Sequence, residues 1–206
     1  MNKYLFNIVI IFILTGNVVA QSNQTTMTRL KKVEDLYLSD KYAQALELVN
    51  KLITEEPNNY QAYLQRAQVY FYLKQSEKRE ADFKKALELA PGQPYVYKKY
   101  GGFLKGNART DEALKLYKQG ITLIPKSAEL HYQVGVIYDD SLKNQQEALR
   151  YYEKAVDLNP TKPHYYYMIG AVLRDLGNLT KAYVAFSQAL AQHARKKNDN
   201  INKGRE

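Results

Sequence analysis

Few side chains in this sequence could perform catalysis or hold a metal ion. The chain has no cysteine, and its three histidines are His131, His164 and His193. None of them has a second histidine or a cysteine at the spacing of a zinc motif. Asp139 and Asp140 are adjacent, but the spacing of an EF-hand calcium loop does not follow them. With neither a Ser/His/Asp set nor a glycine-rich phosphate loop, we predict no catalytic residue, no metal site and no cofactor.

The first 20 residues differ from the rest of the chain. Lys3 carries a positive charge, residues 5–14 are apolar apart from Asn7, and small residues end at Ala20. This order is typical of a secretory signal peptide. An uncleaved membrane anchor is the alternative, but about 10 strongly apolar residues are fewer than the roughly 20 that span a bilayer. We predict export to the periplasm, with an extracellular location as the alternative, and no transmembrane segment after residues 1–20 are removed.

The charge balance is moderately basic. Lysine and arginine number 30 against 21 aspartates and glutamates, a formal net charge of +9. Charges of both signs are interspersed, which is typical of a solvated surface. Because an exported protein rarely meets nucleic acid, we expect no nucleic-acid partner.

Any binding residues must be positioned by a repeating architecture, because four prolines recur at a nearly constant interval. They are Pro57, Pro91, Pro125 and Pro160, spaced 34, 34 and 35 residues apart. A period in this range indicates a repeat protein. Within one period, two apolar stripes with helical spacing follow each other and are separated by Gly106-Asn107. We predict that Thr110 is the N-cap of the second helix and that proline ends it.

The two stripes carry the same residue types in successive periods. The first helix has a small residue and, three positions later, a large one: Ala67 and Tyr70, Gly101 and Leu104, Gly135 and Tyr138, Gly170 and Leu173. The second has an alanine and, four positions later, a large residue: Ala45 and Val49, Ala113 and Tyr117, Ala148 and Tyr152, Ala182 and Phe186. This pattern resembles the tetratricopeptide repeat, a helix–turn–helix of 34 residues. The resemblance implies an all-α, right-handed α-solenoid of antiparallel helix pairs.

About five repeats follow from this register. The predicted organisation is a signal peptide (1–20), a polar linker (21–27), one solenoid (28–194) and a basic polar tail (195–206). The repeats lie near residues 26–59, 60–93, 94–127, 128–162 and 163–194. The fourth has one extra residue in its inner turn (140–144), and Arg79 replaces the close-crossing alanine of the second. The fifth lacks the closing proline, so its second helix runs on into the basic tail. No separate polar capping helix follows this uncapped last helix, so either the basic extension or another chain caps the stack.

Eight of the 19 tyrosines are explained by packing, because one helix pair cannot bury its apolar stripe alone and each pair packs against the next. We predict core positions for Tyr63, Tyr70, Tyr97, Tyr100, Tyr117, Tyr138, Tyr152 and Tyr166.

The resemblance also implies that the first helix of each repeat lines a concave groove. The non-core side of these helices mixes aromatic, aliphatic and charged side chains, which suits a peptide. Family members that bind chaperones carry a clamp for a C-terminal carboxylate, but Glu34, Gln68 and Gly102 stand at clamp positions, so that partner class is rejected. The predicted groove residues are Tyr37, Leu64, Gln68, Phe71, Tyr95, Lys98, Lys105, Tyr132, Asp139, His164, Tyr167 and Arg174.

The sequence therefore predicts a non-enzymatic protein-interaction scaffold. Its groove would bind a peptide segment of an envelope or secreted protein. Two alternatives remain open. One is a self-assembling structural protein, a homo-oligomer formed through the uncapped last helix. The other is an accessory subunit of an envelope complex that processes glycans or secretes proteins.

Overall fold

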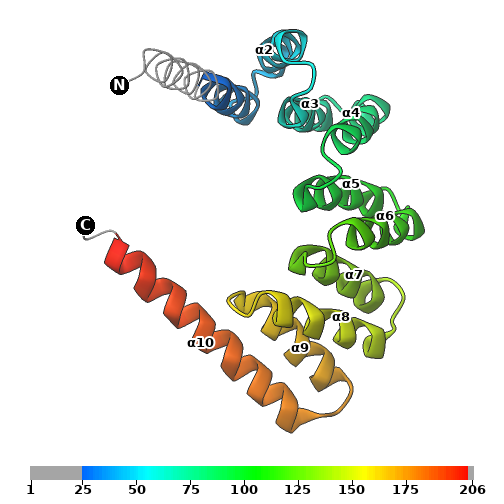
Figure 1. Ribbon diagram of the computed structural model, residues 1–206, viewed down its shortest axis with the longest axis vertical. Helices are drawn as coiled ribbons and strands as arrows, with labels where there is room; N and C mark the ends of the chain where they lie inside the picture. The colour runs from blue at the N-terminus through cyan, green and yellow to red at the C-terminus, as the bar shows by residue number, and fades with distance from the viewer. Residues whose placement is uncertain (1–24, 204–206) are drawn as a thin grey trace, which may run out of the picture. The chain divides into compact units, whose positions relative to one another are not determined.

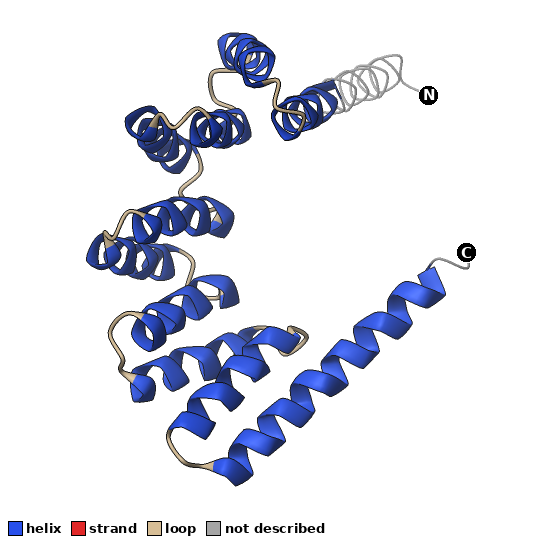
Figure 2. Cartoon of the chain, turned by 180° about the vertical axis from the view of Figure 1, so that it is seen from behind, coloured by secondary structure: helices blue, strands red, loops and turns tan. Residues whose placement is uncertain are grey.

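The computed structural model describes residues 25–203, with side chains to residue 198, and all regular secondary structure in this range is helical (Figure 2). The predicted signal peptide lies outside the described residues. The chain divides into two compact units, residues 1–89 and 90–206. Figure 1 labels their helices. The first unit contains a helix described over residues 25–38, α2 (Tyr42–Glu55), α3 (Tyr60–Tyr72) and α4 (Ser76–Leu89). The second contains α5 (Pro94–Gly106), α6 (Thr110–Leu123), α7 (Ala128–Asp140), α8 (Gln145–Leu158), α9 (Pro163–Asp175) and α10 (Leu179–Lys203).

The repeat register follows the predicted one. Helices α2, α4, α6 and α8 end at Glu55, Leu89, Leu123 and Leu158, each two residues before a proline of the period. Proline has no N–H to continue the hydrogen-bond ladder, so it sets this boundary. The α-solenoid of helix pairs predicted from the sequence is confirmed.

The turn inside each repeat is built from one backbone motif. Asp40, Lys74, Ala108, Lys143 and Gly177 each adopt a positive φ of 53–78°. In four of the five turns the next residue donates its N–H to the carbonyl five residues before it, as in Arg109 to Leu104 at 2.9 Å. This is the Schellman arrangement that closes a helix C-terminus. In the fourth repeat, Asn144 reaches Tyr138, six residues back, at 2.8 Å, which is where the extra residue is accommodated.

Each helix pair of the second unit crosses at a glycine that faces an aromatic ring. A Cβ atom built on Gly101 would lie 2.3 Å from Cζ of Tyr117, and one on Gly135 would lie 2.7 Å from Cδ1 of Tyr152. Gly170 meets Phe186 of α10 in the same way. The rings of Tyr117 and Tyr152 are fully buried. The small-against-large packing predicted for the repeat is therefore confirmed, and it brings the two backbones close together.

The predicted core tyrosines are partly corrected. Tyr138 and Tyr166 are only half-buried, whereas the neighbouring Tyr165 is 2% exposed. Tyr138 stacks its ring on Tyr151 at the surface, 5.6 Å between centroids. The other six tyrosines predicted in the core are buried: Tyr63, Tyr70, Tyr97, Tyr100, Tyr117 and Tyr152.

A buried ion pair joins three helices of the first unit. Arg66 of α3 donates from Nε to Oδ2 of Asp82 at 2.9 Å and from Nη2 to Oδ1 at 2.7 Å. Its Nη1 donates to Oδ1 of Asn50 on α2 at 2.9 Å. Asp82 of α4 is 3% exposed, and burial raises the pKa of its carboxyl while the Arg66 hydrogen bonds oppose that rise. No local sequence pattern indicates this pair, because the two residues are 16 positions apart on different helices.

Arg79 occupies the position where other repeats have the close-crossing alanine, and its guanidinium lies over two aromatic rings. Its Cζ is 4.7 Å from the Phe71 ring centroid and 5.4 Å from that of Phe83. Burial lowers the pKa of the guanidinium. A planar cation on an aromatic face is a favourable contact, so the arginine takes the place of the alanine at this crossing.

Three predicted boundaries differ from the structure. Residues 25–27, predicted as linker, are helical. Helix α6 begins at Thr110 with Arg109 as its N-cap, so Thr110 does not cap it. Helix α10 continues to Lys203, into the predicted tail (195–206). The reason is that residues 191–203 contain neither glycine nor proline and include alanine, arginine and lysine, which favour helix.

The neighbouring glycines Gly101 and Gly102 provide a matched test of the crossing. Gly101→Ala should lower the free energy of unfolding by about 1–3 kcal/mol, because its methyl group meets the buried Tyr117 ring. Gly102→Ala should raise it by up to about 1 kcal/mol, because no atom lies within 4 Å and alanine favours the helix. Urea unfolding followed by circular dichroism measures both. Equal effects of the two substitutions would contradict the close crossing.

The Arg66–Asp82 pair should be worth more than a surface pair. Arg66→Ala should cost about 3–5 kcal/mol of unfolding free energy, because it leaves a buried carboxylate without its cation. Arg150→Ala is the control: it removes an exposed pair with Glu147 and should cost less than about 1 kcal/mol. Chemical denaturation of both variants measures the difference, and a cost for Arg66→Ala as small as the control would refute the buried role.

Candidate protein-interaction surface

The first helix of each pair in the second unit presents a row of side chains near its N-terminus. Tyr95 on α5, Glu129 on α7 and His164 on α9 hold equivalent positions, 34 and 35 residues apart. Lys98, one turn after Tyr95, places its Nζ 2.9 Å from Oε1 of Glu129. The row therefore continues from α5 to α7 through an ion pair.

From α7 to α9 the row continues through aromatic contacts. The Tyr132 ring lies 5.0 Å from that of His164, edge to face, and 5.1 Å from that of Tyr165. Burial raises the pKa of Tyr132 and raises that of Tyr165 to about 12. Partial burial lowers the pKa of His164, and Lys162, Lys98 and Lys196 add to this effect while Glu129 opposes it. His164 is therefore a neutral ring at pH 7. We name the surface of Tyr95, Lys98, Glu129, Tyr132, His164 and Tyr167 the first-helix surface.

Two tyrosines of this surface are open to solvent. Tyr95 is 53% exposed and Tyr167 is 56% exposed. The Nζ of Lys99 lies 5.2 Å from the Tyr95 ring centroid, and the Tyr167 ring lies 5.6 Å from that of Phe186. Tyr132, by contrast, is half-buried and also packs on Tyr152. Aromatic side chains are enriched among the residues that anchor protein partners. Tyr95 and Tyr167, which are exposed and each contact a neighbouring side chain, are therefore the stronger candidates for such anchors.

Three predicted groove residues of the second unit lie near the other end of the same helices. They are Lys105 on α5, Asp139 on α7 and Arg174 on α9. Asp139 accepts a long hydrogen bond of 3.5 Å from the Tyr152 hydroxyl, and burial and the charge of Asp140 raise its pKa. Arg174 pairs with Asp175, next to it on the same helix, at 2.8 Å.

In the first unit, one predicted groove residue is in the core. Tyr37 is 7% exposed and stacks on Tyr72 with 5.4 Å between ring centroids. Its prediction as groove lining is therefore wrong; the first repeat uses this position to fill its apolar cluster. Leu64 and Gln68 are half-buried, and Phe71 is 50% exposed beneath the Arg79 guanidinium.

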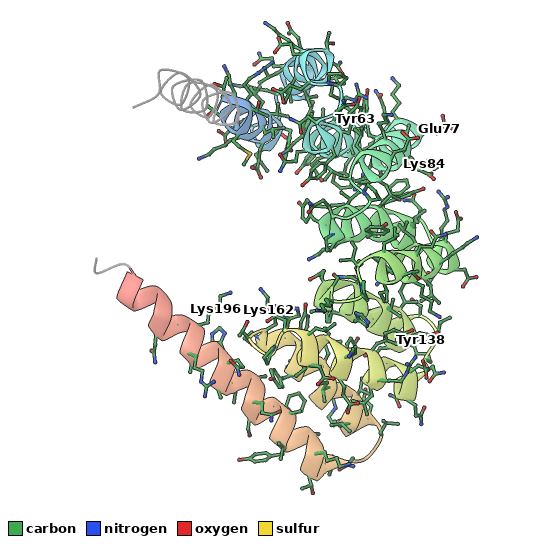
Figure 3. The ribbon with its side chains drawn as sticks, viewed as in Figure 1. Tyr63, Glu77, Lys84, Tyr138, Lys162 and Lys196 are labelled. Carbon is green, nitrogen blue, oxygen red and sulfur yellow. The ribbon has the colours of Figure 1, made fainter. Side chains whose placement is uncertain are left out.

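Three charged residues near this surface were not among the predicted ones. Glu129 could have been found by repeat register alone, because it is equivalent to Tyr95 and His164. Lys162, just before α9, and Lys196 of α10 lie close to each other beside the start of α9 (Figure 3). No sequence pattern joins those two lysines, because they approach only when α10 folds back along α9.

The described residues offer little for other chemistry. Within residues 25–203, no group of three histidine, cysteine or acidic side chains is placed to hold a metal ion. None of the helices in this range is both long and apolar enough to cross a bilayer.

Comparison with known proteins agrees with the repeat architecture. The tetratricopeptide repeat model matches residues 60–93, 128–162 and 163–191. A rice protein, the DnaJ protein P58IPK homolog B of Oryza sativa subsp. japonica, is 32% identical over 98 residues. That match covers 47% of this chain and 21% of the rice protein. The chain therefore spans about a fifth of the length of this relative, and the likeness concerns repeats only.

Solved structures share the fold over most of the chain. The crystal structure of MamA has a TM-score of 0.64 and 21% identity, covering 81% of this chain and 96% of MamA. YrrB, described as a TPR protein with an unusual peptide-binding site, has a TM-score of 0.54 and 17% identity, covering 88% of this chain and 97% of YrrB. At these identities the likeness concerns the fold. With its repeat register, its helix pairs and the matched segments, the chain belongs to the tetratricopeptide repeat proteins.

Proposed function

We propose that this protein is a non-enzymatic interaction scaffold whose first-helix surface binds an extended segment of a partner protein. The observation that carries this proposal is the pair of exposed tyrosines, Tyr95 and Tyr167, at the two ends of one continuous row. Between them lie the Lys98–Glu129 ion pair and the Tyr132–His164 contact. Aromatic anchors separated by polar groups suit a peptide that needs both affinity and register.

The physical case for a partner at this surface rests on desolvation. A tyrosine ring buries a large apolar area at low conformational cost, and its hydroxyl can still find a hydrogen bond. Lys99 already lies over the Tyr95 ring, with its Nζ 5.2 Å from the ring centroid. YrrB is described as having a peptide-binding site on the same kind of fold, which supports peptide binding as the use of such a surface.

We further propose that the protein is exported, so that its partner is an envelope or secreted protein. The support is the order of charge, apolar stretch and small residues in residues 1–20. N-terminal sequencing of the chain recovered from the periplasmic fraction should start at Gln21. Recovery of the chain with residues 1–20 intact and fixed to membranes would favour the anchor instead.

Tyr95→Ala tests the first-helix surface. We expect it to weaken binding of the partner captured from an envelope extract about tenfold, the size of effect of a typical interface anchor. The thermal midpoint should hardly move, because the ring is 53% exposed. Affinity is measured by titrating the purified partner onto immobilised chain.

Leu123→Ala is the matched control. Leu123 is 63% exposed on α6, the second helix of the same repeat, and lies outside the first-helix surface. It should leave the affinity unchanged. Equal binding by wild type and Tyr95→Ala would remove α5 from the binding site, and loss of binding by Leu123→Ala alone would place the partner on the second helices.

A further inference from the structure

The last helix pair ends in an apolar hollow that no other part of the described chain fills. Pro163, His164 and Tyr167 of α9 form one wall, and Phe186, Ala189 and Leu190 of α10 form the other. Leu190 is 72% exposed, and Tyr183, two turns earlier on α10, is 75% exposed. Large apolar side chains with this much exposure on one side of a helix indicate an interaction surface.

The preceding repeat shows what covers the equivalent place. There Tyr132 of α7 and Tyr152 of α8 hold the positions of Tyr167 and Phe186. The site is filled by the first turn of α9: the Tyr165 ring lies 5.1 Å from the Tyr132 ring and is 2% exposed. One repeat earlier, Leu130 in the first turn of α7 packs against Gly120 of α6 and is fully buried. In each case an apolar side chain at the third position of the next helix enters the hollow.

The register of α10 shows which of its exposed positions are covered in the earlier repeats. Leu190 is equivalent to Val156 of α8 and Ile121 of α6, which are both half-buried. Tyr183 is likewise equivalent to Leu149, which packs into the α8–α9 cluster with Met168 and Ile169. The exposed positions of α10 are therefore the ones that the following helix covers in the earlier repeats of the second unit.

The charge around the hollow identifies the partner's chemistry. Lys162 and Lys196 stand near His164 at its edge (Figure 3). Arg195 and Lys197 are exposed beside Lys196. The nearby acidic group, Glu129, is already paired with Lys98 at 2.9 Å. Among the described side chains none forms an ion pair with these lysines or with Arg195, so an incoming segment with carboxylates would be attracted and a basic one repelled.

We propose that the α9–α10 hollow receives the first turn of an amphipathic helix from an acidic partner protein, with one apolar side chain seated between Tyr167 and Leu190. This helix would continue the stack in the way that α9 continues it after α8. A second copy of this chain fits less well, because its Leu130 and Tyr165 are already buried in its own repeats. The lysines and Arg195 near the hollow would also face those of the copy. The hollow shares His164 and Tyr167 with the first-helix surface, but its other wall lies on α10, and the proposal does not depend on peptide binding along α5.

A synthetic peptide tests the hollow directly. The probe copies residues 162–176, the helix that fills the preceding hollow, with Lys162→Glu and Arg174→Glu to supply acidic flanks, and it carries a fluorescent label. We expect saturable binding to the full chain by fluorescence anisotropy. The chain variant Leu190→Glu should weaken it at least about tenfold, as expected for a central anchor contact, and raising the salt concentration should also weaken it.

Two controls match this variant. Val184→Glu introduces the same charge on α10 at a 51% exposed position equivalent to Arg150, which stays exposed within the stack, so binding should be unchanged. A probe with Tyr165→Ala should bind at least about tenfold more weakly, since it lacks the anchor. Circular dichroism of each chain variant should match wild type, because both changed positions are exposed.

Several outcomes would overturn the proposal. One is the absence of saturable binding, and another is equal binding by Leu190→Glu and wild type. If sedimentation shows a dimer of the chain that Leu190→Glu abolishes, the hollow belongs to a second copy and the proposal is wrong. Tyr95→Ala should leave probe binding unchanged, so failure of this proposal and failure of the first-helix surface are separate results.

Discussion

The close crossing of two helices at a glycine is the contact on which the second unit depends. Gly101, Gly135 and Gly170 leave room where any side chain would strike the ring of Tyr117, Tyr152 or Phe186. The aromatic ring fills the space beside the glycine. This packing fixes both the distance between the two helices and the position of one along the other. This contact sets where every other residue of the pair points, including those that face the solvent.

A helix pair held in this way still has an apolar side left over, and the next pair must cover it. Tyr165 and Leu130 do so inside the second unit, where both are almost completely buried. The same rule has a consequence at α10, where Leu190 and Tyr183 remain exposed. Among the described residues these two positions of α10 therefore stay uncovered, and the proposed preference for an acidic partner rests on the lysines near them.

The first-helix surface is shaped by the same constraint. One side of α5, α7 and α9 packs in the core, so equivalent positions on the opposite side of these helices align. Lys98 therefore forms an ion pair with Glu129, and the Tyr132 ring contacts that of His164. Tyr95 and Tyr167 remain exposed at the ends of this row. The contacts along this row are an ion pair and packed aromatic rings.

The sequence alone determined the all-α repeat fold, because the proline period and the small and large residues are local patterns tied to helix geometry. The helices α2, α4, α6 and α8 end just before a proline because proline has no backbone N–H to continue the helix. Only the tertiary structure decided which polar and aromatic residues meet. Arg66 and Asp82 form a buried pair, Tyr37 belongs to the core, and Tyr165 instead of Tyr166 is buried. Helix α10 brings Lys196 near Lys162 for the same reason. These outcomes depend on the angle at which one helix lies on another, and a rotation of one residue moves a side chain by about 100° around the helix.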